Sequence, residues 1–83
     1  MTNAELFRAL ADETRLCIVK KLTEGEKSAC QIIPCSKKSQ PTVSSHLKVL
    51  ANAGVIDFKK SGKERIYFIK DERVKKILGL LGD

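Results

Sequence analysis

The chain has 83 residues, of which 42% are hydrophobic and 31% charged, a composition typical of one small globular domain. No apolar run approaches the roughly 20 residues that a membrane-spanning helix needs. The start, MTNAELFRAL, lacks the basic end and apolar core of a signal peptide. We therefore expect a cytoplasmic protein that does not enter a membrane.

The charge balance favours a polyanionic partner. Sixteen Lys and Arg residues against ten Asp and Glu residues give a formal net charge of +6 and an isoelectric point near 9.4. Such an excess suits nucleic acid, but charge alone is weak evidence because many solvated proteins are basic.

Two short helices are predicted at the start of the chain. The first covers residues 3–11, with Asn3 as its expected N-cap. The second is capped by Asp12 and ends before Gly25. Their apolar stripes comprise Leu6, Phe7 and Leu10 in the first helix and Leu16, Ile18, Val19 and Leu22 in the second.

The next segment, SACQIIPCSKKS, is the least regular part of the chain. A helix that begins at Ser28 meets Pro34, which stops or kinks helices because it lacks an N–H group and its ring clashes with the preceding turn. Residues 35–38 must then form the turn of a helix-turn-helix, although they contain no glycine, which such turns often have.

The stretch SQPTVSSHLKVLANA, residues 39–53, predicts a recognition helix. Ser39 is its expected N-cap, Pro41 falls in its first turn, and Gly54 follows its end. Its apolar face comprises Val43, Leu47 and Leu50. The opposite face comprises Pro41, Ser45, Lys48 and Asn52, flanked by Thr42, Ser44, His46 and Val49. These short polar side chains let a helix approach a groove of DNA and bond base edges or phosphates.

A β-hairpin is predicted after this helix. Residues 55–60 and 63–69 are rich in β-branched and aromatic side chains and are joined through Ser61 and Gly62. The basic residues near its tip are Lys59, Lys60, Lys63 and Arg65, against the acidic Asp57 and Glu64. Such a ribbon can straddle a phosphate backbone; the alternative is that its lysines protect a sheet edge from aggregation.

The last predicted helix begins after Asp71. Its apolar stripe comprises Val74, Ile77, Leu78 and Leu81. A small chain has little surface to cover both this stripe and that of residues 3–11, so we expect the two to pair across a homodimer. The predicted fold is mostly α with a β-hairpin wing, as one domain over residues 1–83.

The order helix, helix, helix-turn-helix, hairpin, helix is that of a winged helix-turn-helix domain. The blocks FRALADETRLCIVKKL, QPTVSSHLKVLANAGVI and GKERIYFI resemble the ArsR/SmtB-type family of metal- and stress-responsive transcriptional repressors. The resemblance implies a homodimer on a pseudo-palindromic operator in double-stranded DNA, with each recognition helix in a major groove and each wing on the flanking backbone. It places the family's DNA-contact positions on Gln40, Thr42, Ser44, Ser45 and His46, and helical geometry adds Lys48.

The family's metal sites are only partly present in this chain. Residues 71–83 contain no histidine, so the zinc-type site that many members carry on the last helix is not expected. Members that sense arsenite, cadmium or lead often carry a CVC-type pair in the third helix; Cys30 aligns with its second cysteine, and Ser28 replaces the first. His46, the only histidine, cannot form a multi-histidine site within one chain, so we expect it to pack or to contact phosphate.

Three interpretations of Cys17, Cys30 and Cys35 remain open. An odd number of cysteines in a chain expected to be cytoplasmic argues against a structural disulfide framework. The thiolates could bind As(III) or a soft metal ion, for which the resemblance implies that three would suffice. Alternatively they form a thiol redox switch, or they are small buried packing residues. Cys35 falls outside the family pattern.

The leading interpretation is a dimeric DNA-binding transcriptional regulator rather than an enzyme. The sequence has no phosphate-binding loop and no acid-base pair around a nucleophile. The alternative is a winged-helix protein-interaction module of a larger transcription or repair assembly. The hydroxyl-rich helix face argues against that module, and salt-dependent binding to duplex DNA separates the two.

Overall fold

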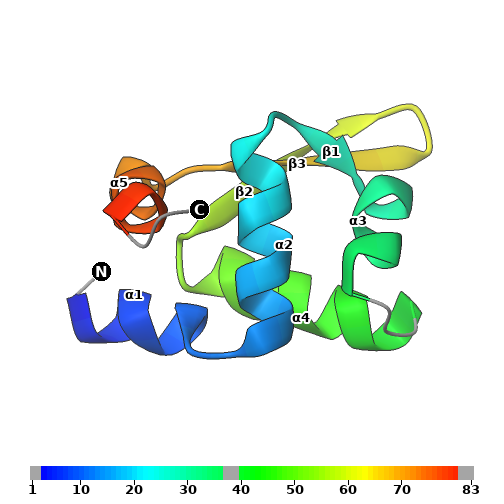
Figure 1. The fold of residues 1–83 in the computed structure, drawn as a ribbon. Coiled ribbons are helices and arrows are strands. Elements are labelled where there is room, and N and C mark those ends of the chain that lie inside the picture. Colours follow the sequence, from blue (N-terminus) through cyan, green and yellow to red (C-terminus); the bar gives the residue numbers. More distant parts are fainter. Residues whose placement is uncertain (1–2, 37–39, 81–83) are drawn as a thin grey trace.

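The computed structural model describes the backbone of residues 3–36 and 40–80 and the side chains of residues 4–32 and 41–80. The elements are α1 (Asn3–Leu10), α2 (Glu13–Thr23), β1 (Lys27–Ser28), α3 (Ala29–Ser36), α4 (Gln40–Asn52), β2 (Ile56–Ser61), β3 (Glu64–Ile69) and α5 (Glu72–Leu80) (Figure 1). Within these ranges no helix is long and apolar enough to span a bilayer. The predicted fold, mostly α with a β-hairpin wing, is confirmed.

Side-chain caps begin two helices at the positions that the sequence predicts. Asp12 Oδ1 accepts a hydrogen bond from the Arg15 backbone N–H at 3.0 Å at the start of α2. Asp71 Oδ1 accepts one from the Arg73 N–H at 3.0 Å at the start of α5. Each carboxylate satisfies a backbone donor that the helix itself leaves without a partner.

The sequence predicts that Pro34 stops or kinks this helix. Helix α3 continues past Pro34 to Ser36, so the expectation of a stop is wrong. The helix begins with a capping box, in which the Gln31 side chain accepts from the Ser28 N–H at 2.8 Å. Pro34 removes one intrahelical donor, and the packing of α3 against α2 and α4 offsets that loss. The turn is expected at residues 35–38, but residues 35 and 36 belong to α3, so that part of the expectation is wrong. Residues 37 and 38 and the expected cap Ser39 lie outside the described residues.

The hairpin wing carries a third strand that the sequence did not reveal. The two-residue β1 pairs antiparallel with β3, and the sheet order is β1-β3-β2. Ser61 pairs with Glu64, so residues 62 and 63 form the turn, one residue later than expected. Gly62 has φ of +63°, a left-handed conformation in which a glycine avoids the strain that a side chain would bring.

The core lies between α2, α4 and the base of the hairpin, and it holds α4 by its apolar face. The predicted stripe of Val43, Leu47 and Leu50 is buried. After α4, the Val55 N–H donates to the Leu50 carbonyl at 3.0 Å, and Gly54 has φ of +78°. This Schellman motif ends the helix at the predicted glycine and directs the chain into β2.

The apolar stripes of α1 and α5 are largely buried within one chain, so the expectation that they need a partner to be covered is wrong. The buried members are Leu6, Leu10, Val74 and Leu78. They are covered because α1 and α5 lie together at one end of the molecule and their side chains join the common core (Figure 1). Leu81 lies outside the described residues.

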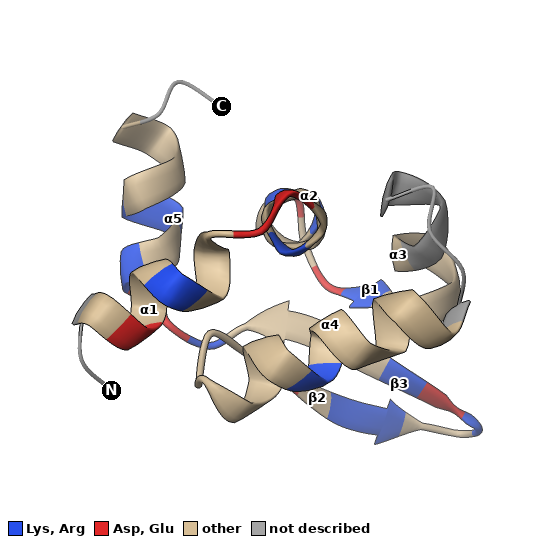
Figure 2. Cartoon of the chain, turned by 90° about the horizontal axis from the view of Figure 1, so that it is seen from below, with Lys and Arg blue, Asp and Glu red and all other residues tan. Residues whose placement is uncertain are grey.

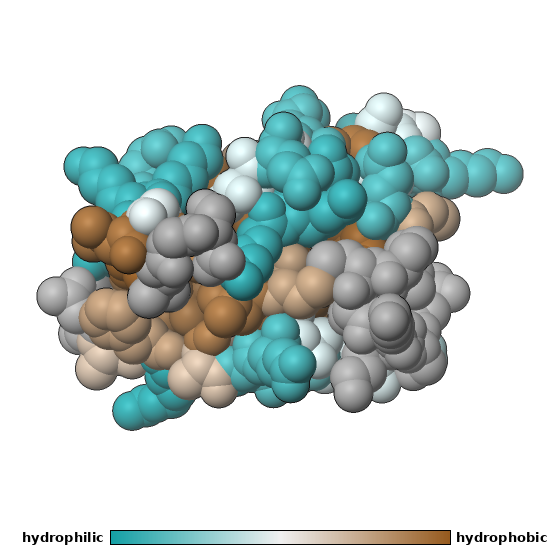
Figure 3. Space-filling model, in the orientation of Figure 1, coloured by the Kyte–Doolittle hydropathy of each residue, from teal (hydrophilic) through white to brown (hydrophobic). Residues whose placement is uncertain are grey.

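Part of this end of the molecule stays apolar and open. Phe7 is 55% exposed and Leu80 is 88% exposed, while Ile77 is half-buried. These three side chains line a groove of about 300 Å³ between α1 and α5. Figure 3 shows brown, apolar surface at this end of the molecule. We call Phe7, Ile77 and Leu80 the open apolar patch.

Candidate nucleic-acid interface

The face of α4 that the sequence predicts to meet DNA is open to solvent. Its exposed side chains include Pro41, Ser44, Ser45, Lys48 and Asn52. Thr42 is half-buried, and the side chain of Gln40 lies outside the described side chains. The buried opposite stripe holds the helix in place, so this polar face is presented as a rigid unit.

The basic hairpin lies beside this helix. Figure 2 shows α4, with its one cationic segment, lying over β2 and β3, whose blue segments continue toward the hairpin tip. Lys60, Lys63 and Arg65 are exposed. Lys59 is exposed as well, and its Nζ lies 3.1 Å from a Glu26 carboxylate oxygen. Because an exposed ion pair contributes only about 0–1 kcal/mol, a phosphate can readily replace Glu26.

A groove of about 480 Å³ separates α4 from the hairpin. It is lined by Ser44, Leu47, Lys48, Ala51, Asn52, Phe58, Arg65 and Tyr67. The structure therefore brings three predicted contact residues, Ser44, Lys48 and Arg65, to one concave surface, although they lie on two elements. Hydroxyl and cationic groups on such a surface can bond phosphate oxygens.

His46 differs from the other predicted contact residues because it lies against α2. Its Nδ1 atom is buried without a hydrogen-bond partner among the described residues and lies 3.9 Å from Asp12 Oδ1. Asp12 is the N-cap of α2, so this contact lies between α4 and the start of α2.

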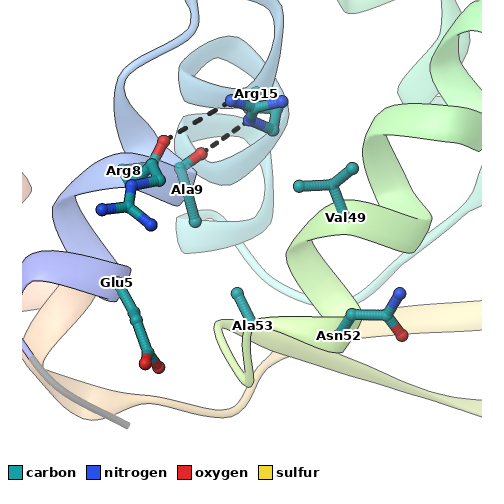
Figure 4. A pocket seen from close by; sticks show the side chains of 7 residues that line it. All are labelled: Glu5, Arg8, Ala9, Arg15, Val49, Asn52 and Ala53. Atoms are coloured by element: carbon teal, nitrogen blue, oxygen red, sulfur yellow. Dashed lines mark hydrogen bonds between the residues drawn. The ribbon is translucent and has the colours of Figure 1, made fainter.

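Arg15 has a role that sequence analysis missed. Its Nε donates to the Ala9 carbonyl at 2.8 Å and its Nη2 to the Arg8 carbonyl at 3.5 Å, so it caps the end of α1 from α2 (Figure 4). One signal in the sequence could have revealed this role. Arg15 lies a few residues after the end of α1, and the last carbonyl groups of a helix lack partners and attract a cation. Figure 4 shows Arg15 beside a groove of about 410 Å³ that extends to Val49 and Asn52 on α4.

The Asp12 cap supports a prediction about stability and pH. Its hydrogen bond from the Arg15 N–H holds the pKa of Asp12 below the ordinary value of 3.8, and the charge of nearby His46 lowers it further. Asp12→Ala is expected to lower the free energy of unfolding at neutral pH by about 1 kcal/mol. Because the folded-state pKa is depressed, this contribution is present above pH 3.8 and is lost as pH falls through the folded-state value.

Urea denaturation at neutral pH and in the acid range measures both parts of this expectation. Asp12→Asn is the matched control, because it keeps an N-cap acceptor but removes the charge. It should retain most of the stability at neutral pH and lose the acid dependence. If the difference in the free energy of unfolding between the parent and Asp12→Ala did not change across the acid range, a charged cap would be excluded.

Two of the three cysteines, Cys17 and Cys30, have described side chains. Cys30 is a free, exposed thiol. Cys17 on α2 is disulfide-bonded, whereas the cysteine count favours free thiols. The side chain of Cys35 lies outside the described side chains. Where side chains are described, no group of three His, Cys, Asp or Glu residues could hold a metal ion.

Comparison with known proteins decides the family. The sequence model of the bacterial regulatory proteins of the ArsR family matches residues 12–57, which run from the cap of α2 into β2. This chain belongs to the ArsR family. The resemblance inferred from the three sequence blocks is therefore confirmed.

This ArsR-family chain is similar in sequence to two known transcriptional regulators. An HTH-type transcriptional regulator of Methanocaldococcus jannaschii is 46% identical over 81 residues, which are 96% of this chain and 91% of that protein. A cadmium resistance transcriptional regulatory protein, the CadC homolog of Staphylococcus aureus, is 38% identical over 79 residues, 94% of this chain. The match spans 65% of that CadC homolog, so this chain corresponds to only part of it.

One solved structure with the same fold comes from a possible member of this family. It is the homodimeric winged helix-turn-helix DNA-binding domain of a possible ArsR-family regulator from Mycobacterium bovis. The TM-score is 0.85 at 28% identity, and the match covers 95% of this chain and 73% of that one. The winged helix-turn-helix fold of this chain is thereby confirmed.

Proposed function

We propose that this ArsR-family chain is a dimeric transcriptional repressor that binds a pseudo-palindromic operator through α4 and the hairpin wing. The observation that carries the proposal is the open polar face of α4 beside a basic hairpin, with a groove between them. A helix enters the major groove of DNA, and a cationic ribbon beside it reaches the flanking phosphates.

The proposed contacts divide by chemistry. The short side chains of α4 read base edges or bond phosphates: Gln40, Thr42, Ser44, Ser45 and His46. The cations bind phosphates: Lys48, Lys59, Lys60, Lys63 and Arg65. In addition to its contact with DNA, His46 is proposed to hold α4 against α2, because its Nδ1 atom is buried beside Asp12.

The proposed dimer forms through the open apolar patch of Phe7, Ile77 and Leu80. Exposed large side chains beside an apolar groove are a common feature of protein interfaces. The Mycobacterium bovis domain, which has the same fold, is homodimeric. A two-fold axis would present two recognition helices to two half-sites, and this is why the operator is expected to be pseudo-palindromic.

Two single substitutions test which residues read bases and which bind the phosphate backbone of DNA. Ser45→Ala is expected to weaken binding to promoter-region duplex about three- to tenfold and to leave binding to random duplex nearly unchanged, because it removes a neutral hydrogen bond. Lys63→Ala is expected to weaken both alike and to reduce the slope of log affinity against log salt by about 1. Titrations at several salt concentrations measure both effects.

Lys75→Ala on α5 is the matched control, because it removes an exposed lysine that lies outside α4, the hairpin and the open apolar patch. It should leave DNA affinity and the salt slope unchanged. Equal losses on both duplexes would make Ser45 a phosphate contact. A parent chain whose DNA binding has no steep salt dependence would favour the alternative, a protein-interaction module.

We also propose that Cys17, Cys30 and Cys35 sense the signal that relieves repression. The disulfide at Cys17 supports an oxidant signal. With Cys30 free, Cys35 is the remaining cysteine of the sequence and is the proposed partner. Peroxide would oxidise one thiolate to a sulfenic acid and be reduced to hydroxide. The second thiolate would then attack the sulfenic sulfur, which forms the disulfide and displaces a second hydroxide. A soft metal ion or As(III) is the second candidate, supported by similarity to a cadmium resistance regulator.

A further inference from the structure

Phe58 stands between a buried anchor and an exposed cation on the hairpin. It is paired across the strands with Tyr67, and their ring centroids lie 5.6 Å apart at an interplanar angle of 48°. Tyr67 is buried, so it fixes the ring of Phe58 from the core side. Arg65 Cζ lies 4.7 Å from the centroid of the Phe58 ring. The three side chains form a stack that ends in a guanidinium.

The strand register places a second cation directly opposite this guanidinium. Lys60 pairs with Arg65, and the alternation of side chains puts both on the face that carries Phe58 and Tyr67. Like charges directly opposite each other in a sheet repel, and an anion between them removes that repulsion. The hairpin therefore carries a pair of cations, Lys60 and Arg65, whose mutual repulsion falls when a polyanion binds.

The stack also orients Arg65 toward the recognition helix. Arg65 and Phe58 line the groove between the hairpin and α4, across which lie Ser44 and Lys48. A free arginine loses much rotamer freedom when it binds a phosphate, whereas one already held on a ring loses less. An aromatic face attracts the guanidinium and leaves its N–H groups available to an acceptor.

We propose that Phe58 is a positioning residue, which holds Arg65 in the groove between α4 and the hairpin for a phosphate of the bound DNA strand. This inference rests on the proposed DNA binding. It assigns Phe58 a role without direct contact to DNA and makes Arg65 the phosphate contact on the side of the wing that faces α4. A phosphate contact does not depend on base sequence, so the role can be tested on any duplex.

A double-mutant cycle on a random-sequence duplex of about two helical turns provides the test. Arg65→Ala is expected to weaken binding about fivefold or more and to lower the salt slope by about 1. Phe58→Leu keeps an apolar side chain but removes the ring, and is expected to weaken binding about two- to fivefold. The double variant should bind like Arg65→Ala alone, because the ring acts only through the guanidinium. Phe58→Tyr keeps a ring and should bind like the parent.

Two measurements keep a structural effect separate from a positioning effect. Thermal unfolding and sedimentation verify that Phe58→Leu is folded and has the parent's oligomeric state. In a second cycle, Arg65→Lys keeps the charge but lacks the planar group that stacks on the ring, so Phe58→Leu should weaken binding less in this background than in the parent. Losses that add in both cycles would overturn the inference, as would a Phe58→Tyr variant as weak as Phe58→Leu.

The outcomes also separate this inference from the proposed function. A parent chain that binds no duplex would overturn the proposed function itself. A parent that binds duplex with a steep salt slope, together with an Arg65→Ala variant of unchanged affinity, would leave DNA binding intact and overturn the assignment of Arg65 and Phe58.

Discussion

A chain that carries Phe7→Asp and Leu80→Asp is expected to be a folded monomer that binds operator DNA about 100-fold or more weakly than the parent. Both side chains are largely exposed in the single chain, at 55% and 88%, so the charges cost the monomer little. In the proposed dimer they would be buried without partners, which costs several kcal/mol. A monomer also loses the effective concentration that helps a dimer occupy its second half-site.

Sedimentation, circular dichroism and gel shift on promoter-region DNA measure the three parts of this expectation. The matched control is Leu78→Asp on α5, whose side chain is only 3% exposed within its own chain. It should unfold the monomer instead of merely separating two folded copies. A Phe7→Asp, Leu80→Asp variant that stays dimeric at micromolar concentration would place the dimer contact elsewhere.

The second large effect is expected from the thiols. Peroxide should weaken operator binding by the parent about 5- to 150-fold, the usual range of coupling between two sites, and dithiothreitol should restore it. Cys17→Ser should abolish this response and keep operator binding, because serine retains the size but cannot form the disulfide. Cys35→Ser should do the same if it is the partner of Cys17.

Cys30 separates the two signal chemistries. As a free thiol it is dispensable for a disulfide at Cys17, so Cys30→Ser should keep the peroxide response. If arsenite or cadmium is the signal, the reduced parent should leave DNA without any oxidant, and Cys30→Ser should lose that response. A variant with all three cysteines changed to serine that still responds like the parent would make the cysteines packing residues.

Local sequence signals determined where most helices begin and end. Asp12 and Asp71 cap helices, and Gly54 ends one, as their positions predict. These caps join residues two to five positions apart, so they can be recognised without knowledge of the fold. The helical period of the sequence likewise predicted the two faces of α4. Leu50 on the apolar face is buried, and Ser45 on the polar face is exposed.

The family, and a helix with the features of a recognition helix, were also within reach of the sequence. Blocks such as QPTVSSHLKVLANAGVI combine a buried stripe with an open polar face, and both depend on the order of residues along one helix. The contact residues on this helix remain predictions, since binding to DNA is what tests them.

Only the tertiary structure decided which apolar side chains remain open, which strands pair and which distant residues meet. The stripes of α1 and α5 are regular in sequence, but Leu78 is buried in the chain's own core while Leu80 is exposed. Strand β1 has two residues and exists because β3 pairs with it. The cap of α1 by Arg15 likewise joins different elements. Such contacts depend on how elements pack, and short-range periodicity in one segment carries no information about its neighbours in space.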